Sequence, residues 1–205
     1  MFLIEAMQRC LFFKDFVHFI KLLKHYSLKF ALKIYHWVIM SNHYHLLLEL
    51  DEPSRLSRFM AGLNRAYTHY YHKVNETSGL LWQGRFKSQP VQKENYMFAC
   101  GRYIERNPVS ANIVSEAVDY TYSSAKFYCF GKSDGLTTPD QLYLELADNS
   151  LERQFKYSQF LKNFDSEEEK LFANLENPVG NIEFIKRLVR QGRQLVARRA
   201  GRIRK

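Results

Sequence analysis

The chain has 205 residues, of which 46% are hydrophobic and 15% aromatic, so it can bury the core of one domain with an appendage and is not intrinsically disordered. Its three cysteines, Cys10, Cys100 and Cys129, are far apart and show no CxxC spacing. This excludes a disulfide framework or zinc ribbon and predicts buried thiols in a reducing cytosol. No apolar run approaches the ~20 residues that cross a bilayer, and no secretory pattern is present. We therefore expect a cytoplasmic protein without a membrane partner.

The net charge of +9 is concentrated at the C-terminal end. Residues 186–205 carry nine lysines and arginines and no acidic residue. Because the whole chain has 30 basic and 21 acidic residues, the first 185 residues are neutral. Such a basic arm is attracted to polyanions, and nucleic acid is the first candidate. The alternative is a solvated tail with no role of its own.

Hydrophobic periodicity predicts a helix followed by a hairpin in the first fifty residues. Apolar residues recur at helical spacing over 15–26. Two short runs, 32–40 and 43–50, are rich in β-branched, aromatic and aliphatic residues. They are separated only by Ser41 and Asn42, which predicts two strands joined by a two-residue turn.

A long amphipathic helix is predicted over 54–74, with its apolar and basic residues on opposite faces. The segment 80–91 indicates a strand, bulged at Gly84. A further helix over 92–106 should end at Asn107, because a residue that precedes proline is pushed out of helical geometry. Shorter helical segments follow, and these are predicted over 122–130, 139–147, 150–163 and 180–196.

The resulting order is helix, strand, strand, helix, strand, helix. One more strand at the start would make it the ferredoxin-like split βαβ arrangement. Residues 1–14 must supply this strand, and their sequence does so poorly. We predict an α+β fold: a ferredoxin-like split βαβ antiparallel sheet with helices on one face, plus a C-terminal helical appendage. The expected division is a core over residues 1–130 and an appendage over 131–205 that ends in the basic tail.

The central motif is His43-Tyr44-His45. Side chains alternate along a strand, so both histidines point to one face and Tyr44 to the other. Two adjacent imidazoles can share a divalent metal if a third ligand arrives from another element. The pattern alone is weak, since a hydrogen-bonded histidine pair at a sheet end has the same sequence.

The third ligand should lie on the helix over 92–106, packed across that face. Tyr103 and Asn107 are four residues apart and therefore stacked one turn from each other. A phenol can act as a nucleophile, and an amide oxygen can complete a metal shell. Tyr103 also shares its helix face with Tyr96 and Cys100, as a core tyrosine would. The residues alone leave both interpretations open.

Several motifs in order along the chain resemble the REP-associated tyrosine transposases, which belong to the HUH single-tyrosine transposase superfamily related to insertion-sequence enzymes. The segments that carry this resemblance are MSNHYHLLLEL (40–50), LNRAYTHYYHK (63–73), GLLWQGRFKS (79–88), RYIERNPVSANIV (102–114), YSSAKFY (122–128) and RAGRIRK (199–205). Members usually begin with a strand that leads into an Arg-Gly turn, and MFLIEAMQRC has no such glycine. We therefore expect the first strand to be incomplete.

The resemblance implies a function and a set of site residues. His43 and His45 match the two histidines that bind Mg²⁺ or Mn²⁺, and Asn107 matches the position that often completes the metal shell. Tyr103 matches the nucleophile that cuts single-stranded DNA and becomes linked to its 5′ phosphate. Such enzymes recognise imperfect hairpins, often work as dimers, and would act at the bacterial nucleoid.

For DNA contacts, Arg85 and Lys87 are the first choices because family members keep basic residues there. Arg58 and Arg65 on the long helix come second, and a solvated face is the ordinary explanation for them. Two other functions compete with transposition. One is a catalytically decayed or domesticated protein that binds repeat DNA without cutting it. The other is a metal-dependent hydrolase that uses water, but its candidate acid, Glu49, would lie roughly 13 Å from His45 along the strand.

Overall fold

The computed structural model describes residues 1–7, 16–163, 165–173, 175 and 177–190. Four strands form one antiparallel sheet in the order β2-β3-β1-β4. They are β1 (Phe2–Met7), β2 (Lys33–Ile39), β3 (His43–Glu49) and β4 (Lys87–Pro90). With α1 (Phe16–Lys29) between β1 and β2 and α2 (Leu56–Asn75) between β3 and β4, this is the split βαβ topology, and the predicted α+β class is confirmed. Cys10 and the basic tail from residue 191 onward lie outside the described residues.

The expectation of an incomplete first strand was wrong. β1 lies between β3 and β4, and it pairs with β3 over six residues from Phe2↔Leu48 to Met7↔His43. Leu3 is buried on one face of the sheet and Ile4 on the other. The alternation of these side chains is enough to build a buried strand without the Arg-Gly turn, because pairing on both sides satisfies the backbone.

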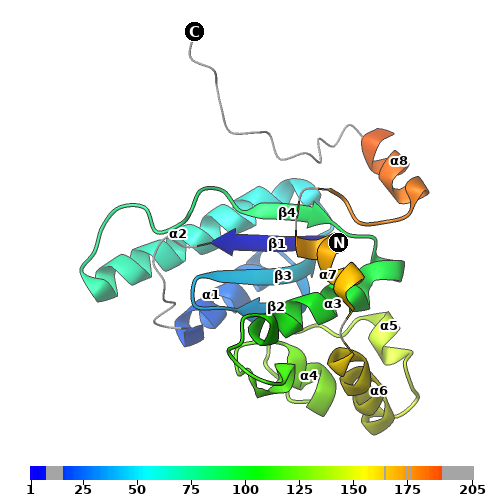
Figure 1. Cartoon of the computed structure of the whole chain (residues 1–205). Helices are drawn as coiled ribbons and strands as arrows, with labels where there is room; N and C mark the ends of the chain where they lie inside the picture. The colour runs from blue at the N-terminus through cyan, green and yellow to red at the C-terminus, as the bar shows by residue number, and fades with distance from the viewer. Residues whose placement is uncertain (8–15, 164, 174, 176, 191–205) are drawn as a thin grey trace.

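Helices cover both faces of the sheet (Figure 1). The two crossover helices α1 and α2 pack on one face, where Phe19, Tyr44 and Phe59 are fully buried. The opposite face is covered by α3 (Lys93–Ser110) and α7 (Ser166–Ala173), around Leu47 and Phe172. The prediction of helices on one face thus holds for the crossover helices only. The second face is closed by elements that follow the split βαβ unit in the sequence.

The turn between β2 and β3 is the predicted two-residue hairpin, in which the Met40 N–H donates to the His43 carbonyl (2.8 Å). A β-bulge interrupts β2 between Ile34 and His36. Side chains therefore stop alternating at this point, and both Tyr35 and His36 face the α3 side of the sheet.

The predicted end of the helix at Asn107 was wrong, because α3 continues through Pro108 to Ser110. Proline removes one backbone donor, but Pro108 is buried, and the following amides still bond backwards. The Ala111 N–H reaches the Asn107 carbonyl at 2.9 Å. Asn107 therefore stays helical and remains one turn beyond Tyr103.

The predicted strand over 80–91 is shorter in the structure. Only Lys87–Pro90 pairs as a strand with β1, and the chain turns at Gly84, whose φ is +86°. The residues before β4 are held on α2 instead: the Trp82 indole N–H donates to Thr68 Oγ1 (2.9 Å). Arg85 consequently lies in a bend and not on the strand.

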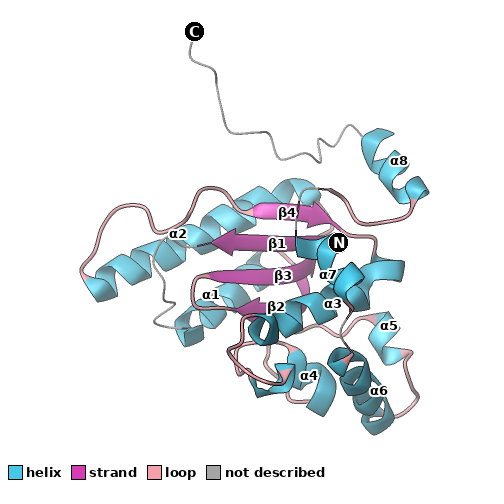
Figure 2. Cartoon of the chain, viewed as in Figure 1, coloured by secondary structure: helices cyan, strands magenta, loops and turns pink. Residues whose placement is uncertain are grey.

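Short helices form the C-terminal part of the chain (Figure 2). The remaining elements are η1 (Pro53–Arg55), η2 (Ala117–Asp119), α4 (Ala125–Phe130), α5 (Gln141–Leu144), α6 (Ser150–Lys162) and α8 (Ile182–Arg190). The predicted helices over 122–130, 139–147 and 150–163 are present in shortened form, the described part of the one over 180–196 is helical from Ile182 to Arg190, and α7 was not predicted. Cys100 and Cys129 are buried free thiols, as expected. None of the described helices is both long and apolar enough to span a membrane.

Candidate metal and nucleophile site

β3 places His43 and His45 side by side on the sheet face that α3 covers. Their ring centroids are 5.0 Å apart. Tyr44, between them, points to the opposite face, where its hydroxyl donates to Asn64 of α2 (2.7 Å). The hydrophobic alternation of β3 therefore fixes the orientation of both imidazoles, because a register slip of one residue would bury them under α2.

α3 crosses this face and brings Tyr103 and Asn107 to the histidines. The Asn107 Oδ1 atom is 3.4 Å from His43 Nε2, and the Tyr103 ring lies 5.6 Å from the His45 ring. The two α3 residues are stacked one turn apart, as their spacing requires. The structure thus brings together all four side chains that the sequence singled out, from two segments about sixty residues apart.

Both imidazoles are neutral near pH 7. Burial is the main cause that lowers the pKa of His45 to about 3, and electrostatic repulsion from His43 and Lys87 contributes to the same shift. Burial also lowers the pKa of His43, although its hydrogen bond to Asn107 opposes the shift. A neutral imidazole has a free lone pair and is the form that binds metals.

Burial raises the pKa of the Tyr103 phenol, and the nearby carboxylate of Glu5 raises it further, while Asn107 opposes the shift. The phenol is therefore neutral in the metal-free protein. An attack by its oxygen has to be coupled to loss of its proton.

Two imidazole nitrogens and an amide oxygen are donors that can hold a divalent cation. Ligands that bind Mg²⁺ at about 2.1 Å in adjacent octahedral positions lie about 3 Å apart, close to the separation of His43 Nε2 and Asn107 Oδ1. His45 Nδ1 is buried and has no hydrogen-bond partner among the described residues. Within those residues, no group of three or more His, Cys, Asp or Glu side chains is arranged to hold a metal. Asn107, the third ligand predicted from the sequence, places an amide oxygen beside His43.

Sequence reasoning missed Glu5, which lies on β1 directly opposite His45. One carboxylate oxygen is 3.9 Å from His45 Nδ1, and the other is 3.9 Å from the Nζ atom of Lys87 on β4. Glu5 is 13% exposed. The only signal for it in the sequence was strand alternation within residues 2–7, which was discounted because that segment lacked the expected turn glycine.

Glu49 lies on the same face of β3 but is committed to other partners. Its carboxylate accepts hydrogen bonds from Lys93 (3.0 Å) and from Tyr35. Lys93 is also paired with the buried Asp140 (2.7 Å). This cluster ties the far end of the face to α3, so Glu49 is not an acid of the candidate site.

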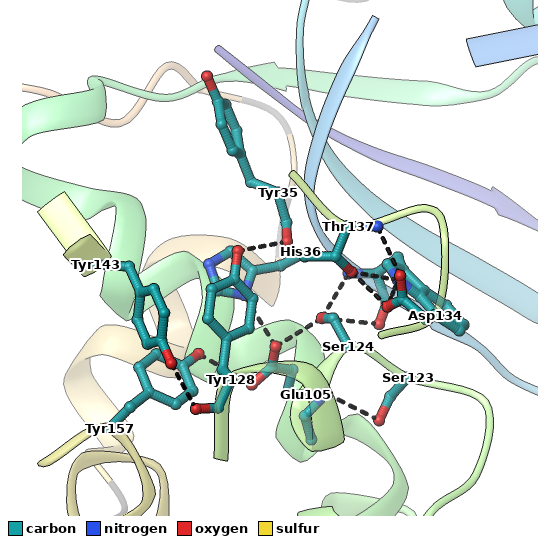
Figure 3. Close-up of polar contacts among 12 residues, drawn as sticks. Tyr35, His36, Glu105, Ser123, Ser124, Tyr128, Asp134, Thr137, Tyr143 and Tyr157 are labelled. Carbon is teal, nitrogen blue, oxygen red and sulfur yellow. Dashed lines mark hydrogen bonds and ion pairs between the residues drawn. The ribbon is translucent and has the colours of Figure 1, made fainter. Parts of the chain in front are cut away.

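A buried polar network fixes α3 to the sheet (Figure 3). The Glu105 carboxylate contacts His36 Nδ1 (2.9 Å) and accepts hydrogen bonds from Ser124 (2.6 Å) and Tyr157 (2.9 Å). Glu105 and His36 are both fully buried. Because Glu105 lies between Tyr103 and Asn107 in the helix, this network sets the height and rotation of the segment that carries both.

Gly101 allows this close approach. A Cβ atom at position 101 would lie 2.6 Å from the His36 ring. No side chain can occupy that position unless the ring moves, so the glycine permits direct packing of α3 on the bulged part of β2.

The basic residues proposed to contact DNA fall into two groups. Lys87 is 57% exposed and lies on the site face, next to Glu5 in the register of the sheet. Arg85 is exposed in the bend just before β4. Arg58 and Arg65 are exposed on α2, which covers the opposite face, so the sheet separates them from the histidines.

Fold and geometry together define an α+β protein in which two neutral imidazoles, a phenol and an amide converge on one sheet face. A protein-family model described as "Transposase IS200 like" matches residues 4–107, just over half of the 205 residues, from β1 to Asn107. The chain therefore belongs to the IS200-like transposase family.

A search of curated protein sequences finds no match. Among solved structures, the chain is similar to one described as "Structure of the REP associates tyrosine transposase bound to a REP hairpin". The TM-score is 0.56 and the identity 18%, and the match covers 68% of this chain and 85% of that chain. At this identity the similarity demonstrates a shared fold.

Proposed function

We propose that this protein is a metal-dependent single-stranded DNA endonuclease and strand transferase that forms a covalent 5′-phosphotyrosine intermediate through Tyr103. The observation that carries the proposal is the approach of Tyr103 and Asn107 to His43 and His45 across one sheet face. Membership in the IS200-like family supports it, because such proteins are typically tyrosine nucleases with a pair of histidines.

In this proposal Tyr103 Oη attacks the phosphorus of a DNA phosphodiester. A bond forms between the tyrosine oxygen and phosphorus, and the bond from phosphorus to the 3′ oxygen breaks. The phenol loses its proton, and the leaving 3′ oxygen gains one. The phosphotyrosine link conserves the energy of the phosphodiester, so a DNA 3′-OH can later reverse the step without ATP.

His43, His45 and Asn107 would hold Mg²⁺ or Mn²⁺, since their nitrogen and amide oxygen donors face one another. A divalent cation, when bound, polarises the scissile phosphate and neutralises its developing charge. The chain's own contribution is to keep the two imidazoles neutral by burial and to fix their orientation through the register of β3.

The substrate class follows from the charge and from the structural relative. The solved structure similar to this chain is that of a transposase bound to a REP hairpin, and we propose hairpin-bearing single-stranded DNA as the substrate here. Lys87 and Arg85 are the first candidates to hold its backbone because Lys87 lies on the site face and Arg85 in the bend just before β4, and Arg58 and Arg65 come second. The proposed catalytic unit extends to about residue 130, and the basic tail would add affinity that depends on salt.

The experiment is an adduct assay with a hairpin-bearing oligonucleotide in Mn²⁺. Wild-type protein should give a protein–DNA species that survives denaturation, and Tyr103→Phe should give none. Tyr96→Phe is a matched control, since it removes a hydroxyl from the same face of α3, and it should retain the adduct. His43→Ala should reduce adduct formation strongly while leaving the Tyr103 hydroxyl in place.

The absence of an adduct on hairpins taken from around the gene, in a folded protein that binds them, would contradict catalysis. That result would favour the alternative of a DNA-binding protein that does not cut. Cleavage that persists in Tyr103→Phe would point to a water nucleophile instead. The complete β1 removes the main sequence argument for a decayed protein.

A further inference from the structure

We propose that Glu5 is a positioning residue for the metal site. Its carboxylate accepts a hydrogen bond from the Nδ1–H of His45, which leaves Nε2 of that ring free to bind the cation. This inference rests on the proposed function. It concerns a residue outside the four that the sequence motifs indicate.

The geometry that carries the inference is a row of side chains across the sheet. Lys87 of β4, Glu5 of β1 and His45 of β3 occupy directly paired positions, so all three project from the same face. His45 Nδ1 is the buried atom without a partner, and a Glu5 oxygen is the acceptor placed beside it at 3.9 Å. In this proposal the glutamate side chain rotates so that its oxygen closes this separation to a hydrogen bond.

A neutral imidazole carries its proton on only one ring nitrogen. A carboxylate beside Nδ1 favours the proton on that atom, which leaves the lone pair on Nε2. Metal-binding histidines commonly donate a hydrogen bond from the N–H of their second ring nitrogen to a carboxylate or carbonyl oxygen. This partner fixes the tautomer and the ring orientation. Glu5 supplies that partner for His45.

The neighbouring histidine already shows the same arrangement. His43 Nδ1 lies 2.7 Å from Asn42 Oδ1, and its Nε2 faces Asn107. Both imidazoles would then be oriented in the same way, each with an oxygen acceptor behind Nδ1. Glu5 is not counted as a ligand itself, because no third His, Cys, Asp or Glu of the described residues is placed to complete a metal site with the two histidines.

Glu5 also faces Lys87, whose Nζ atom is 3.9 Å from its second oxygen. The same carboxylate therefore connects a metal-binding histidine to a candidate DNA-binding lysine. Glu49 provides the contrast on this face, since its carboxylate is bonded to Lys93 and Tyr35 and has no histidine beside it.

The test compares Glu5→Ala, Glu5→Gln and Glu49→Gln in the full chain. One readout is the tautomer of His45 in metal-free protein, from long-range ¹H–¹⁵N correlation spectra of histidine-labelled samples, with His45→Gln to assign the ring. The other is Mn²⁺ affinity from the EPR signal of free Mn²⁺. Unfolding midpoints in EDTA establish that each variant is folded.

We expect His45 of the wild type to carry its proton on Nδ1. Glu5→Ala should lose this preference and bind Mn²⁺ about 10- to 100-fold more weakly, the effect typical of second-sphere partners of metal ligands. Glu5→Gln should retain part of the Nδ1 preference and part of the Mn²⁺ affinity, because its amide carbonyl oxygen can still accept a hydrogen bond. Glu49→Gln should bind Mn²⁺ as the wild type does.

Wild-type affinity in Glu5→Ala, or an equal loss in Glu5→Gln and Glu5→Ala, would overturn the positioning role. A different outcome would overturn the proposed metal site as well: no Mn²⁺ binding by the wild type, or unchanged binding in His45→Gln. The two failures are therefore distinguishable, because the first leaves histidine-dependent metal binding intact.

Discussion

Helix α3 takes part in two polar sites that differ in the number and length of their hydrogen bonds. At Glu105, three partners contact the carboxylate at 2.6–2.9 Å, and the pair with His36 is fully buried. At Asn107, two residues further, the contact to His43 is 3.4 Å long, and His45 Nδ1 has no partner within the described part of the chain. The Glu105 carboxylate is thus held by three short contacts, whereas the histidine site has only the longer one; one buried ring nitrogen in each site, His36 Nε2 and His45 Nδ1, has no hydrogen-bond partner among the described residues.

This difference separates structure from function. A buried carboxylate that accepts several short hydrogen bonds rigidifies the parts that it connects. The network at Glu105 therefore holds α3 in position, and the cluster at the histidines, whose contact is longer, is where we propose that a cation binds.

The largest effect on this comparison should come from breaking the Glu105 network. Glu105→Ala removes the common partner of His36, Ser124 and Tyr157, and we expect a loss of about 3–5 kcal/mol in the free energy of unfolding, typical of a buried pair that loses one member. Urea denaturation measures it. Glu52→Ala, which breaks an exposed pair with Arg55, should cost less than about 1 kcal/mol. Equal losses in the two variants would contradict the role assigned to the network.

A smaller effect should come from the pH dependence of the histidine site. The pKa of His45 is about 3 in the folded protein and 6.5 in the unfolded chain, so the unfolded chain binds more protons between these two pH values. The contribution of His45 to the free energy of unfolding is fully present above pH 6.5 and is lost progressively as the pH decreases below that value. Between pH 7 and pH 5 the loss should be about 2 kcal/mol.

The measurement is the difference in unfolding free energy between pH 7 and pH 5, in EDTA, for wild type and His45→Gln. The variant should lose about 2 kcal/mol less than the wild type over this interval. His25→Gln, at an exposed histidine of α1, should keep the wild-type dependence. A parallel pH dependence in wild type and His45→Gln would show that His45 is not held neutral by burial.

The smallest effect should come from the surface beside the histidine site. Lys87→Gln should weaken binding of hairpin DNA similarly for all sequences and reduce the slope of log affinity against log salt by about 1. Arg58→Gln, on the opposite face of the sheet, should change the slope less. Fluorescence anisotropy over a salt series gives both slopes. The reverse ranking would place the DNA on the α2 side.

The sequence by itself determined much of the fold and which residues form the candidate site. Strand alternation put His43 and His45 on one face, and helical spacing stacked Tyr103 and Asn107, because both periodicities are local properties of the backbone. The same local rules predicted the hairpin at Ser41 and Asn42 and the long helix α2.

Tertiary structure decided what local rules could not reach. Glu5 became part of the site only through the pairing of β1 with β3, and His36 turned towards α3 only through the bulge in β2. α3 passed Pro108 because packing around the buried ring outweighed the local preference of the residue before proline. These features depend on contacts between segments distant in sequence, whose free energies exceed local propensities of about 1 kcal/mol per residue.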